Sequence, residues 1–360
     1  MKDRKCCSVD SRGGIAVIEY SDQARLASNP LVSVVMLAYG HEAYIRDAID
    51  GVLMQRADFP IELIIAEDAS PDGTLSIALD YQRQFPETIR VLTSQENVGM
   101  IENDRRARAA CRGEFIALCE GDDYWTDSNK LEMQVEIMRG DENVMLVHSD
   151  VGHLIGQKTL PDANKSLRQY APDGDFSVAA WSGPLHVYTP TMLFRRSVSD
   201  RILDSGIYEQ KLEYFPGDYV IAFFCSQMGV IRYIPKSLSV YRQTPGSMMN
   251  SGEARKIHYA AQSVEIARFL IDYFRPHPSR ASEMLKRFRG IYLRRLAISG
   301  SFRQLHAERR RQKQGHVSSI ASLAAMAGGR ALLLYRYIEE RIRLRTRYRK
   351  IEQSVNAPGQ

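Results

Sequence analysis

Cysteine is scarce in this chain, and its spacing argues against two common uses. Only five of the 360 residues are cysteine. No CxxC pair or Cys/His ligand spacing occurs, which argues against a structural zinc site and against a disulfide framework. Unpaired cysteines of this kind are typical of a reducing compartment, and we expect a cytoplasmic location.

Long apolar runs and the common phosphate- and metal-binding motifs are lacking as well. No uncharged apolar stretch reaches the roughly 20 residues that a membrane-spanning helix needs, and the first residues carry no apolar signal core. Neither GxGxxG nor GxxxxGK[ST] occurs, and His41-Glu42 has no second histidine to complete HExxH. These absences argue against dinucleotide-binding dehydrogenases, P-loop NTPases and HExxH metalloproteases.

Charge is distributed unevenly along the chain. Residues 251–360 hold 23 lysines and arginines against 8 acidic residues, whereas residues 1–250 hold 25 basic and 35 acidic residues. Parts of opposite charge are expected to have different roles. We therefore predict a flexible leader over residues 1–29, a main domain over 30–250, and a basic helical region over 251–360.

Within the main domain, continuous apolar runs alternate with helical spacing. The predicted buried strands cover residues 31–37, 61–66, 89–93, 114–119 and 144–148. The predicted helices between them cover residues 42–55, 72–85, 100–111 and 127–139. This alternation predicts a Rossmann-like α/β fold, a mostly parallel sheet with helices on both faces. Ligands of such sheets bind beyond the carboxyl ends of the strands.

The rest of the chain is less regular. We expect a polar loop over the site at residues 156–182, a buried helix over 218–228, and short strands. The predicted strands cover residues 191–194, 230–234 and 238–242. The predicted C-terminal helices cover residues 253–274, 281–299, 302–313 and 318–352.

Acidic side chains follow two of the predicted strands. Glu120, Asp122 and Asp123 come directly after the fourth strand, and Glu67 and Asp68 end the second. Clustered acids beside a buried strand are costly unless a cation or hydrogen-bond donors neutralise them. Carboxylates together with substrate phosphates are the usual environment of Mg²⁺ or Mn²⁺. The pattern therefore predicts an enzyme that handles a phosphorylated donor.

Several short motifs, in order and at characteristic spacing, resemble one enzyme family. They are VSVVMLAY at 32–39, IIAEDASPDGT at 64–74, NVG at 97–99, GEFIALCEGDD at 113–123, YR at 241–242 and PGS at 245–247. From residue 30 to about 250, the chain resembles the family 2 glycosyltransferases, which have the nucleotide-diphospho-sugar transferase (GT-A) fold.

The resemblance implies roles for the donor side of the site. The triplet Glu120-Gly121-Asp122 stands where the family carries its metal-binding acidic motif, so Asp122 and Glu120 are expected to hold Mg²⁺ or Mn²⁺. The family more often begins this motif with Asp. The structural alternative to a metal site is an acidic turn that caps the next helix. The expected donor-binding residues are Ala38, Tyr39, Glu67, Asp68, Asn97, Gly99, Glu120, Asp122 and Arg242. Turn capping by Asp68 and core packing of Tyr39 are the structural alternatives.

The resemblance also implies a catalytic residue and an acceptor side. Asp218 matches the acid that removes the proton of the acceptor hydroxyl in inverting transfer, although its position also suits a helix N-cap. Asp123, Trp181 and Thr191 are expected on the acceptor side, with loop packing as the alternative for Trp181. Thr244 stands where the family often has His.

The implied function is that of an inverting, metal-dependent glycosyltransferase. It would move one sugar from a nucleotide-diphosphate sugar, with UDP favoured, to a glycan or lipid-linked glycan in cell-surface polysaccharide biosynthesis. A processive synthase is not expected, because membrane spans and a QxxRW motif are lacking. One alternative is a sugar nucleotidyltransferase, which needs a Gly-rich basic loop where this chain has Ala38-Tyr39-Gly40. Another is a non-catalytic glycan- or partner-binding module, against which Asp122, Asp123 and Asp218 argue.

The basic C-terminal region interleaves arginines with leucines, tyrosines and isoleucines at residues 330–345. This pattern suits a helix at an anionic membrane surface, so we expect a peripheral location at the cytoplasmic face. A helix docked on its own domain and a dimer contact are the alternatives. No nucleic-acid partner is expected, because no stacking or groove-reading module accompanies the charge.

Overall fold

A computed structural model of the chain describes residues 5–8, 16–156, 158–160, 179–182, 187–210, 212–214, 216–244, 252–301 and 304. The chain divides into two compact units, Met1–Ser299 and Gly300–Gln360. Nearly all described residues belong to the first unit. Apart from residue 304, the helices predicted over 302–313 and 318–352 lie outside the described residues, as do the basic segment 330–345 and most of the predicted loop 156–182.

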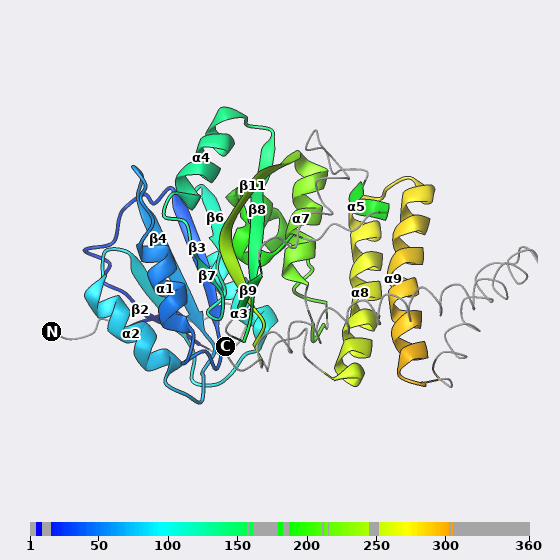
Figure 1. Cartoon of the computed structure of the whole chain (residues 1–360), viewed down its shortest axis with the longest axis horizontal. Coiled ribbons are helices and arrows are strands. Elements are labelled where there is room, and N and C mark those ends of the chain that lie inside the picture. The colour runs from blue at the N-terminus through cyan, green and yellow to red at the C-terminus, as the bar shows by residue number, and fades with distance from the viewer. Residues whose placement is uncertain are drawn as a thin grey trace, which may run out of the picture. The chain divides into compact units, whose positions relative to one another are not determined.

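The described residues form one sheet of eleven strands, whose central part is parallel as predicted (Figure 1). Its parallel strands are β3 (Val32–Ala38), β4 (Ile61–Glu67), β5 (Ile89–Thr93) and β6 (Phe115–Leu118). They lie side by side in the order β5-β4-β3-β6. The chain first moves outward from β3 to β5 and then returns to the other side of β3. The strand order therefore reverses between β3 and β6, which is where open α/β sheets bind ligands.

Beyond β6 the sheet becomes mixed. It continues through β10 (Leu193–Arg195), β8 (Val144–Ile155), β11 (Val230–Arg242) and β7 (Tyr124–Trp125), and β9 (Lys158–Leu160) pairs with β8. The prediction of two short strands over 230–234 and 238–242 was wrong, because β11 is one strand parallel to β8. Its register shifts between Ile234 and Ser239, where Pro235 and Lys236 interrupt the apolar pattern.

Part of the predicted flexible leader belongs to the sheet. Strand β1 (Lys5–Ser8) pairs with β2 (Val17–Tyr20), which pairs antiparallel with β5. Glu19 Oε1 accepts a hydrogen bond from Arg90 Nε at 2.9 Å. Four-residue strands are too short to give a clear periodic signal, so their pairing could not be predicted from the sequence.

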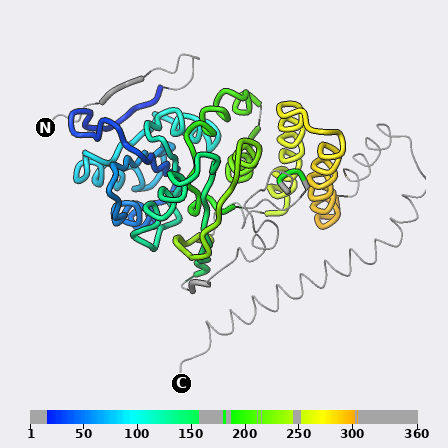
Figure 2. The backbone as a smooth tube through the Cα atoms, turned by 90° about the horizontal axis from the view of Figure 1, so that it is seen from above, coloured from blue at the N-terminus to red at the C-terminus, as the bar shows by residue number. Residues whose placement is uncertain are grey.

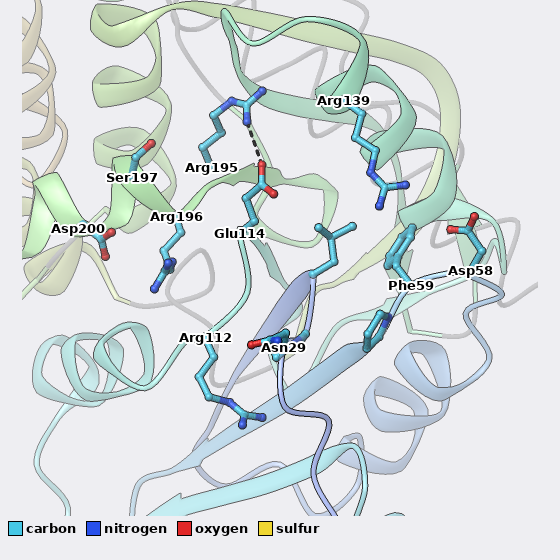
Figure 3. Close-up of a pocket in the computed structure, with 13 residues that line it drawn as sticks. Asn29, Asp58, Phe59, Arg112, Glu114, Arg139, Arg195, Arg196, Ser197 and Asp200 are labelled. Carbon is cyan, nitrogen blue, oxygen red and sulfur yellow. Dashed lines mark hydrogen bonds and ion pairs between the residues drawn. The ribbon is translucent and has the colours of Figure 1, made fainter.

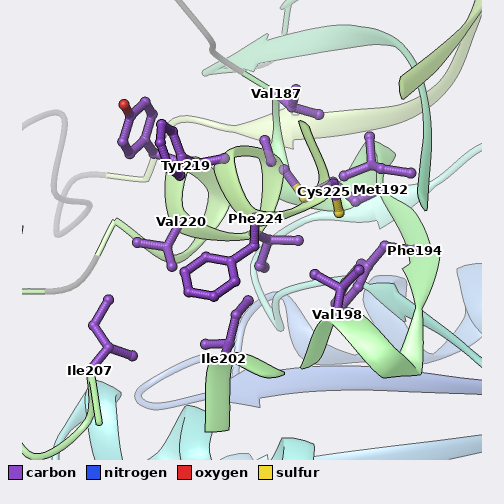
Figure 4. Close-up of a cluster of buried hydrophobic side chains, with 14 of the residues drawn as sticks. Val187, Met192, Phe194, Val198, Ile202, Ile207, Tyr219, Val220, Phe224 and Cys225 are labelled. Atoms are coloured by element: carbon purple, nitrogen blue, oxygen red, sulfur yellow. The ribbon is translucent and has the colours of Figure 1, made fainter. Parts of the chain in front are cut away.

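Helices cover both faces of the sheet, each over its own apolar cluster. One face packs against α1 (Ile45–Leu53), α2 (Thr74–Gln84) and α4 (Lys130–Gly140). The other packs against α3 (Met100–Ala109), α6 (Arg196–Leu203) and α7 (Gly217–Met228). Successive residues of β3 alternate between these clusters, Val34 and Met36 to the first and Val35 to the second. Figure 4 shows the second cluster around α7 and α6.

Helices α8 (Glu253–Phe274) and α9 (Pro278–Ile298) lie side by side and extend the second cluster (Figure 2). Phe274 contacts Phe224 edge-on, with ring centroids 4.9 Å apart, and Phe288 contacts Tyr219 at 5.3 Å. Charge changes near residue 250, but the compact unit continues to Ser299. In the described ranges, no helix is both long and apolar enough to cross a membrane.

A buried ion cluster stabilises the amino-terminal edge of the parallel strands. The Glu62 side chain on β4 is 1% exposed and accepts a hydrogen bond from Ser33 Oγ at 2.6 Å. It also accepts from Arg90 Nη1 at 3.0 Å and Arg112 Nε at 2.8 Å. Burial alone would raise the pKa of Glu62. Hydrogen bonds from Ser33 and Arg112 and the charge of Arg90 outweigh this effect, so the pKa lies below its ordinary value.

We expect Glu62→Gln to lower the free energy of unfolding by about 3 kcal/mol at neutral pH, because it leaves two arginines beside a buried neutral group. A carboxyl whose pKa is lowered by folding stabilises the protein above its unfolded pKa and loses this effect as the pH falls. The difference between wild type and variant should therefore shrink in acid. Urea unfolding at neutral pH and at about pH 4 measures both effects.

Glu114→Gln provides the matched control for this substitution. The Glu114 side chain is 61% exposed and lies 3.4 Å from Arg195, so its loss should cost under about 1 kcal/mol. Equal effects of the two substitutions would contradict the assigned role of Glu62.

Candidate active site

The carboxyl ends of β3 and β6 meet and bring the first predicted motif into place. Backbone N–H groups of Cys119 and Gly121 donate to Val35 O at 3.0 Å and Leu37 O at 2.9 Å, so the acidic turn lies against the end of β3. Tyr39 follows β3 and is 51% exposed. Its ring is accessible to a planar ligand, whereas Ala38 beside it is buried.

The carboxylates of the turn repel one another in a buried environment. Burial, followed by the charges of Asp122 and Asp218, raises the pKa of Glu120 to about 8. Burial and the neighbouring charges of Asp122 and Glu120 also raise the pKa of Asp123 well above its ordinary value. Asp122 Oδ2 accepts from Thr244 Oγ1 at 3.3 Å. The sequence motif is therefore a compact cluster of carboxyl groups, in which burial and mutual repulsion favour the protonated forms of Glu120 and Asp123.

A divalent cation fits this cluster. Glu120 Oε2 is buried and has no hydrogen-bond partner among the described residues, as expected for an oxygen that faces a ligand position. Among the described residues, no group of three or more His, Cys, Asp or Glu has a metal-binding arrangement. Mg²⁺ and Mn²⁺ typically bind through one or two carboxylates together with substrate phosphates.

Arg242, predicted to pair with the diphosphate, holds the acidic turn in this structure. Its backbone N–H donates to Asp123 Oδ1 at 2.8 Å and its Nε to Asp122 O at 2.9 Å. Its Nη2 donates to Asp47 Oδ2 at 2.8 Å, and the guanidinium lies over the rings of Tyr44 and Tyr124. A pairing with the diphosphate stays a prediction, while the contacts shown position the turn.

His41 is a site residue that the sequence did not reveal. A Cβ atom added to Gly121 would lie 2.6 Å from His41 Nδ1, so the close approach of this ring requires glycine at the middle of the acidic triplet. Burial lowers the pKa of His41, although the charges of Asp122 and Asp72 oppose the shift. Only the folded arrangement of loop and turn shows this contact.

Glu67 and Asp68 close the end of β4 rather than facing open space. Glu67 accepts hydrogen bonds from the backbone N–H groups of Ala69 and Ser70 and from Thr93 Oγ1. Asp68 accepts from Val98 N at 2.8 Å and Gly99 N at 3.0 Å, and is 3% exposed. These contacts agree with the structural alternative of turn capping, and direct contacts with base or ribose stay predictions.

The Asn97–Gly99 loop is thereby tied to the second strand end. Asn97 Nδ2 donates to Asp68 O at 3.0 Å, and its Oδ1 accepts from Gly99 N at 2.9 Å. Gly99 has a φ of +84°, which favours glycine, and directly precedes α3. The predicted donor residues Ala38, Asp68, Asn97 and Gly99 therefore lie at neighbouring strand ends.

Two arginines of α3 are buried, although arginine side chains are usually exposed. Arg106 is 6% exposed, and its Nη2 donates to Glu67 O at 2.7 Å while its Nη1 donates to Ser94 Oγ at 2.9 Å. Arg108 is 3% exposed and donates through Nε to both oxygens of Asp104. Helical spacing alone did not separate these buried arginines from exposed ones, because the face of α3 that meets the sheet is polar.

Asp218 lies in the first turn of α7 and close to the acidic turn of β6. Its Oδ1 accepts from Tyr219 N at 2.7 Å, and its charge contributes to the raised pKa of Glu120. Burial and then the charge of Asp218 raise the pKa of Tyr214, so the two groups lie within electrostatic reach of each other. The fold thus brings Asp218 near the metal motif, from almost one hundred residues further along the chain.

The remaining predicted acceptor residues are buried. Thr191 is fully buried, and its carbonyl accepts from Gln134 Nε2 at 2.8 Å. Trp181 is 1% exposed, lies edge-on to Phe223 with ring centroids 4.8 Å apart, and donates to Gln227 Oε1. This environment agrees with the packing alternative for Trp181 and gives no support to sugar stacking by it.

A cavity of about 780 Å³ lies at the opposite edge of the sheet (Figure 3). Residues that precede β3, β4 and β6 line it, together with the start of α6. Its arginines include Arg112 and Arg195, which are already held by Glu62 and Glu114. The cavity lies at the amino ends of the parallel strands, so it is separate from the strand ends that carry the acidic motifs.

Comparisons with known proteins identify the domain. Residues 33–203 match the model of glycosyl transferase family 2. An uncharacterized protein of Mycobacterium tuberculosis is 35% identical over 214 residues, 59% of this chain and 58% of that protein. The putative teichuronic acid biosynthesis glycosyltransferase TuaG of Bacillus subtilis is 37% identical over 109 residues, 30% of this chain and 42% of that protein. The chain thus spans less than two thirds of the length of these relatives.

Solved structures share the fold. TarS 1–349 of S. aureus in complex with UDP-GlcNAc has a TM-score of 0.54 at 18% identity, covering 73% of this chain and 72% of that chain. The mannosyltransferase PcManGT of Pyrobaculum calidifontis, in complex with GDP-Man and Mn²⁺, has a TM-score of 0.50 at 18% identity, covering 87% and 83%. These neighbours confirm the predicted GT-A fold class. Residues 33–203 therefore form a glycosyl transferase family 2 domain.

Proposed function

We propose that this protein is an inverting glycosyltransferase that moves one sugar from a nucleotide-diphosphate sugar to a hydroxyl of a glycan or lipid-linked glycan. The donor is of the UDP type, and the pathway is cell-surface polysaccharide biosynthesis. One observation carries the proposal: Glu120, Asp122 and Asp123 gather at the strand-order reversal between β3 and β6, within electrostatic reach of Asp218.

The donor is held at the carboxyl ends of the central strands. The exposed ring of Tyr39 stacks on the base, and the loop of Asn97 and Gly99 faces the ribose and sugar. Asp122, assisted by Glu120, would hold Mg²⁺ or Mn²⁺. When bound, the cation offsets the negative charge that develops on the leaving nucleotide. The names of two structural neighbours support this assignment, since they record UDP-GlcNAc in one and GDP-Man with Mn²⁺ in the other.

Asp218 supplies the base. As the acceptor oxygen forms its bond to the anomeric carbon, the Asp218 carboxylate takes the hydroxyl proton. The bond from the anomeric carbon to the diphosphate oxygen breaks, and its electron pair leaves with the nucleotide. Attack from the face opposite the leaving group inverts the configuration at this carbon, and no covalent enzyme intermediate forms.

A donor panel tests this proposal directly. The full chain is incubated with UDP-, GDP- and dTDP-sugars in the presence of Mn²⁺, and the release of nucleoside diphosphate is measured with and without EDTA. We expect slow hydrolysis of one donor class that EDTA abolishes. A protein that turns over no donor, and whose thermal stability no nucleotide changes, would instead be a non-catalytic binding module.

We further propose a peripheral location at an anionic membrane surface, through the basic C-terminal helices. Within the described residues, α9 supports this with six basic side chains and one acidic one, and Arg280, Lys286 and Arg294 are exposed. The protein should co-sediment with phosphatidylserine-containing vesicles and not with phosphatidylcholine vesicles, and added salt should release it. Equal sedimentation with both would contradict an electrostatic contact.

A further inference from the structure

Four partly exposed tyrosines lie close to the acidic turn or to the start of α7, which carries Asp218. Tyr214 stacks on Tyr259 of α8, with ring centroids 4.3 Å apart and an angle of 28° between the planes. Tyr241 lies 5.4 Å from Tyr188. All four side chains are neither buried nor fully exposed. The predicted mechanism gives none of them a role, and none lies in the apolar core.

These rings belong to one region of the site. Tyr241 stands on β11 next to the acidic turn, since Arg242, its neighbour, binds Asp122 and Asp123. Burial and then the charges of Asp123 and Asp122 raise the pKa of Tyr241. The charges of Asp218, Tyr259 and Tyr241 all act on Tyr214. The tyrosines Tyr214 and Tyr241 therefore lie within electrostatic reach of Asp218 and of the acidic turn, respectively.

Helix α8 fixes part of this group in place. Gln262 Oε1 accepts hydrogen bonds from Glu213 N at 2.9 Å and Tyr214 N at 2.6 Å, one turn away from Tyr259 on the same helix. One helix thus supplies a ring and also anchors the backbone that presents the other. Helix α8, which was expected to be part of a separate basic region, therefore contacts the segment that precedes α7 and Asp218.

We propose that Tyr214 and Tyr259, with Tyr241, form the acceptor subsite, and that the acceptor group bound there is a pyranose ring of a glycan. This inference rests on the proposed function. Aromatic faces carry partial negative charge and bind the weakly positive C–H groups of one sugar face, while the phenol hydroxyls remain available for hydroxyl groups. A lipid or simple alcohol acceptor would need an apolar channel rather than amphipathic rings.

Binding is measured on the full chain with a panel of methyl pyranosides, by saturation-transfer difference NMR in the presence of UDP and Mn²⁺. We expect at least one methyl pyranoside to bind, and sorbitol, which has no ring, not to bind. Tyr259→Ala and Tyr214→Ala should each weaken pyranoside binding about tenfold, whereas the UDP signal should be unchanged.

Two control variants make the result specific. Tyr259→Phe keeps the ring and should retain most of the pyranoside binding. Tyr81→Ala removes a ring on α2 that contacts Phe85 and Asp50, outside the aromatic group, and should have no effect. Circular dichroism and the UDP signal show whether each variant is folded.

The outcomes separate this inference from the proposed function. Binding of UDP without binding of any pyranoside, or pyranoside binding that survives Tyr259→Ala and Tyr214→Ala, would overturn the acceptor subsite alone. Loss of both UDP and pyranoside binding in the wild type would overturn the proposed function together with the inference. Tyrosine-dependent pyranoside binding without UDP binding would support the subsite and contradict the donor assignment.

Discussion

Asp218→Asn is expected to lower the rate of sugar transfer by about 10²- to 10⁴-fold, the range that positioned general bases contribute. The amide has nearly the same shape as the carboxylate and can still accept from Tyr219 N at the start of α7. It cannot take a proton from the acceptor hydroxyl, so the effect should fall on kcat rather than on the KM of the donor. Initial rates at saturating donor, with product quantified by mass spectrometry, measure this effect.

Asp204→Asn is the matched control, because this exposed aspartate at the end of α6 carries no proposed role. Its transfer rate should equal that of the wild type. Should Asp218→Asn retain more than about a tenth of the wild-type kcat, the base must be sought elsewhere in the site.

The second large effect is expected for Asp122→Asn. Its carboxylate is the proposed cation ligand, and loss of this negative charge should lower kcat/KM for the donor by about 10²- to 10³-fold, a loss comparable with removal of a main electrostatic contact in other active sites. The defect should include a weaker dependence on Mn²⁺ concentration. Donor hydrolysis across a Mn²⁺ titration separates this loss from a simple loss of folded protein.

Asp58→Asn is a suitable control for this variant. Asp58 is exposed and lines the cavity at the opposite edge of the sheet, so the substitution alters the total charge equally without altering the site. An unchanged response to Mn²⁺ in Asp122→Asn would show that the acidic turn has another purpose, such as capping the chain before α4.

The parallel half of the sheet could be predicted from the sequence because both faces of its strands are buried. Continuous apolar runs such as residues 34–38 of β3 are distinctive, and the helices between the strands have clear spacing. The mixed half of the sheet was harder to predict, because β10 has three residues and β7 has two. Their pairing also depends on strands that are far away in the sequence. Long-range antiparallel pairing of such short segments leaves no local pattern in the sequence.

The same contrast between local patterns and long-range contacts applies to the candidate site. Acids at strand ends, such as Asp122 and Asp68, could be identified because their order and spacing are local features of the sequence. The role of Arg242 as a support for the acidic turn and the approach of His41 to Gly121 could not, since both depend on how separate loops fold together. The sequence also did not indicate that Tyr259 lies near the site, because the basic charge of residues 251–360 suggested a region separate from the main domain.

The central claim is that acidic side chains at the β3 and β6 ends bind a nucleotide diphosphate together with a divalent cation. Isothermal titration calorimetry of the full chain with UDP, in Mn²⁺ and then in EDTA, tests it most directly. We predict saturable binding of UDP in Mn²⁺ that weakens at least about tenfold in EDTA. Absence of UDP, GDP and dTDP binding in Mn²⁺, or affinity that EDTA leaves unchanged, would contradict the claim.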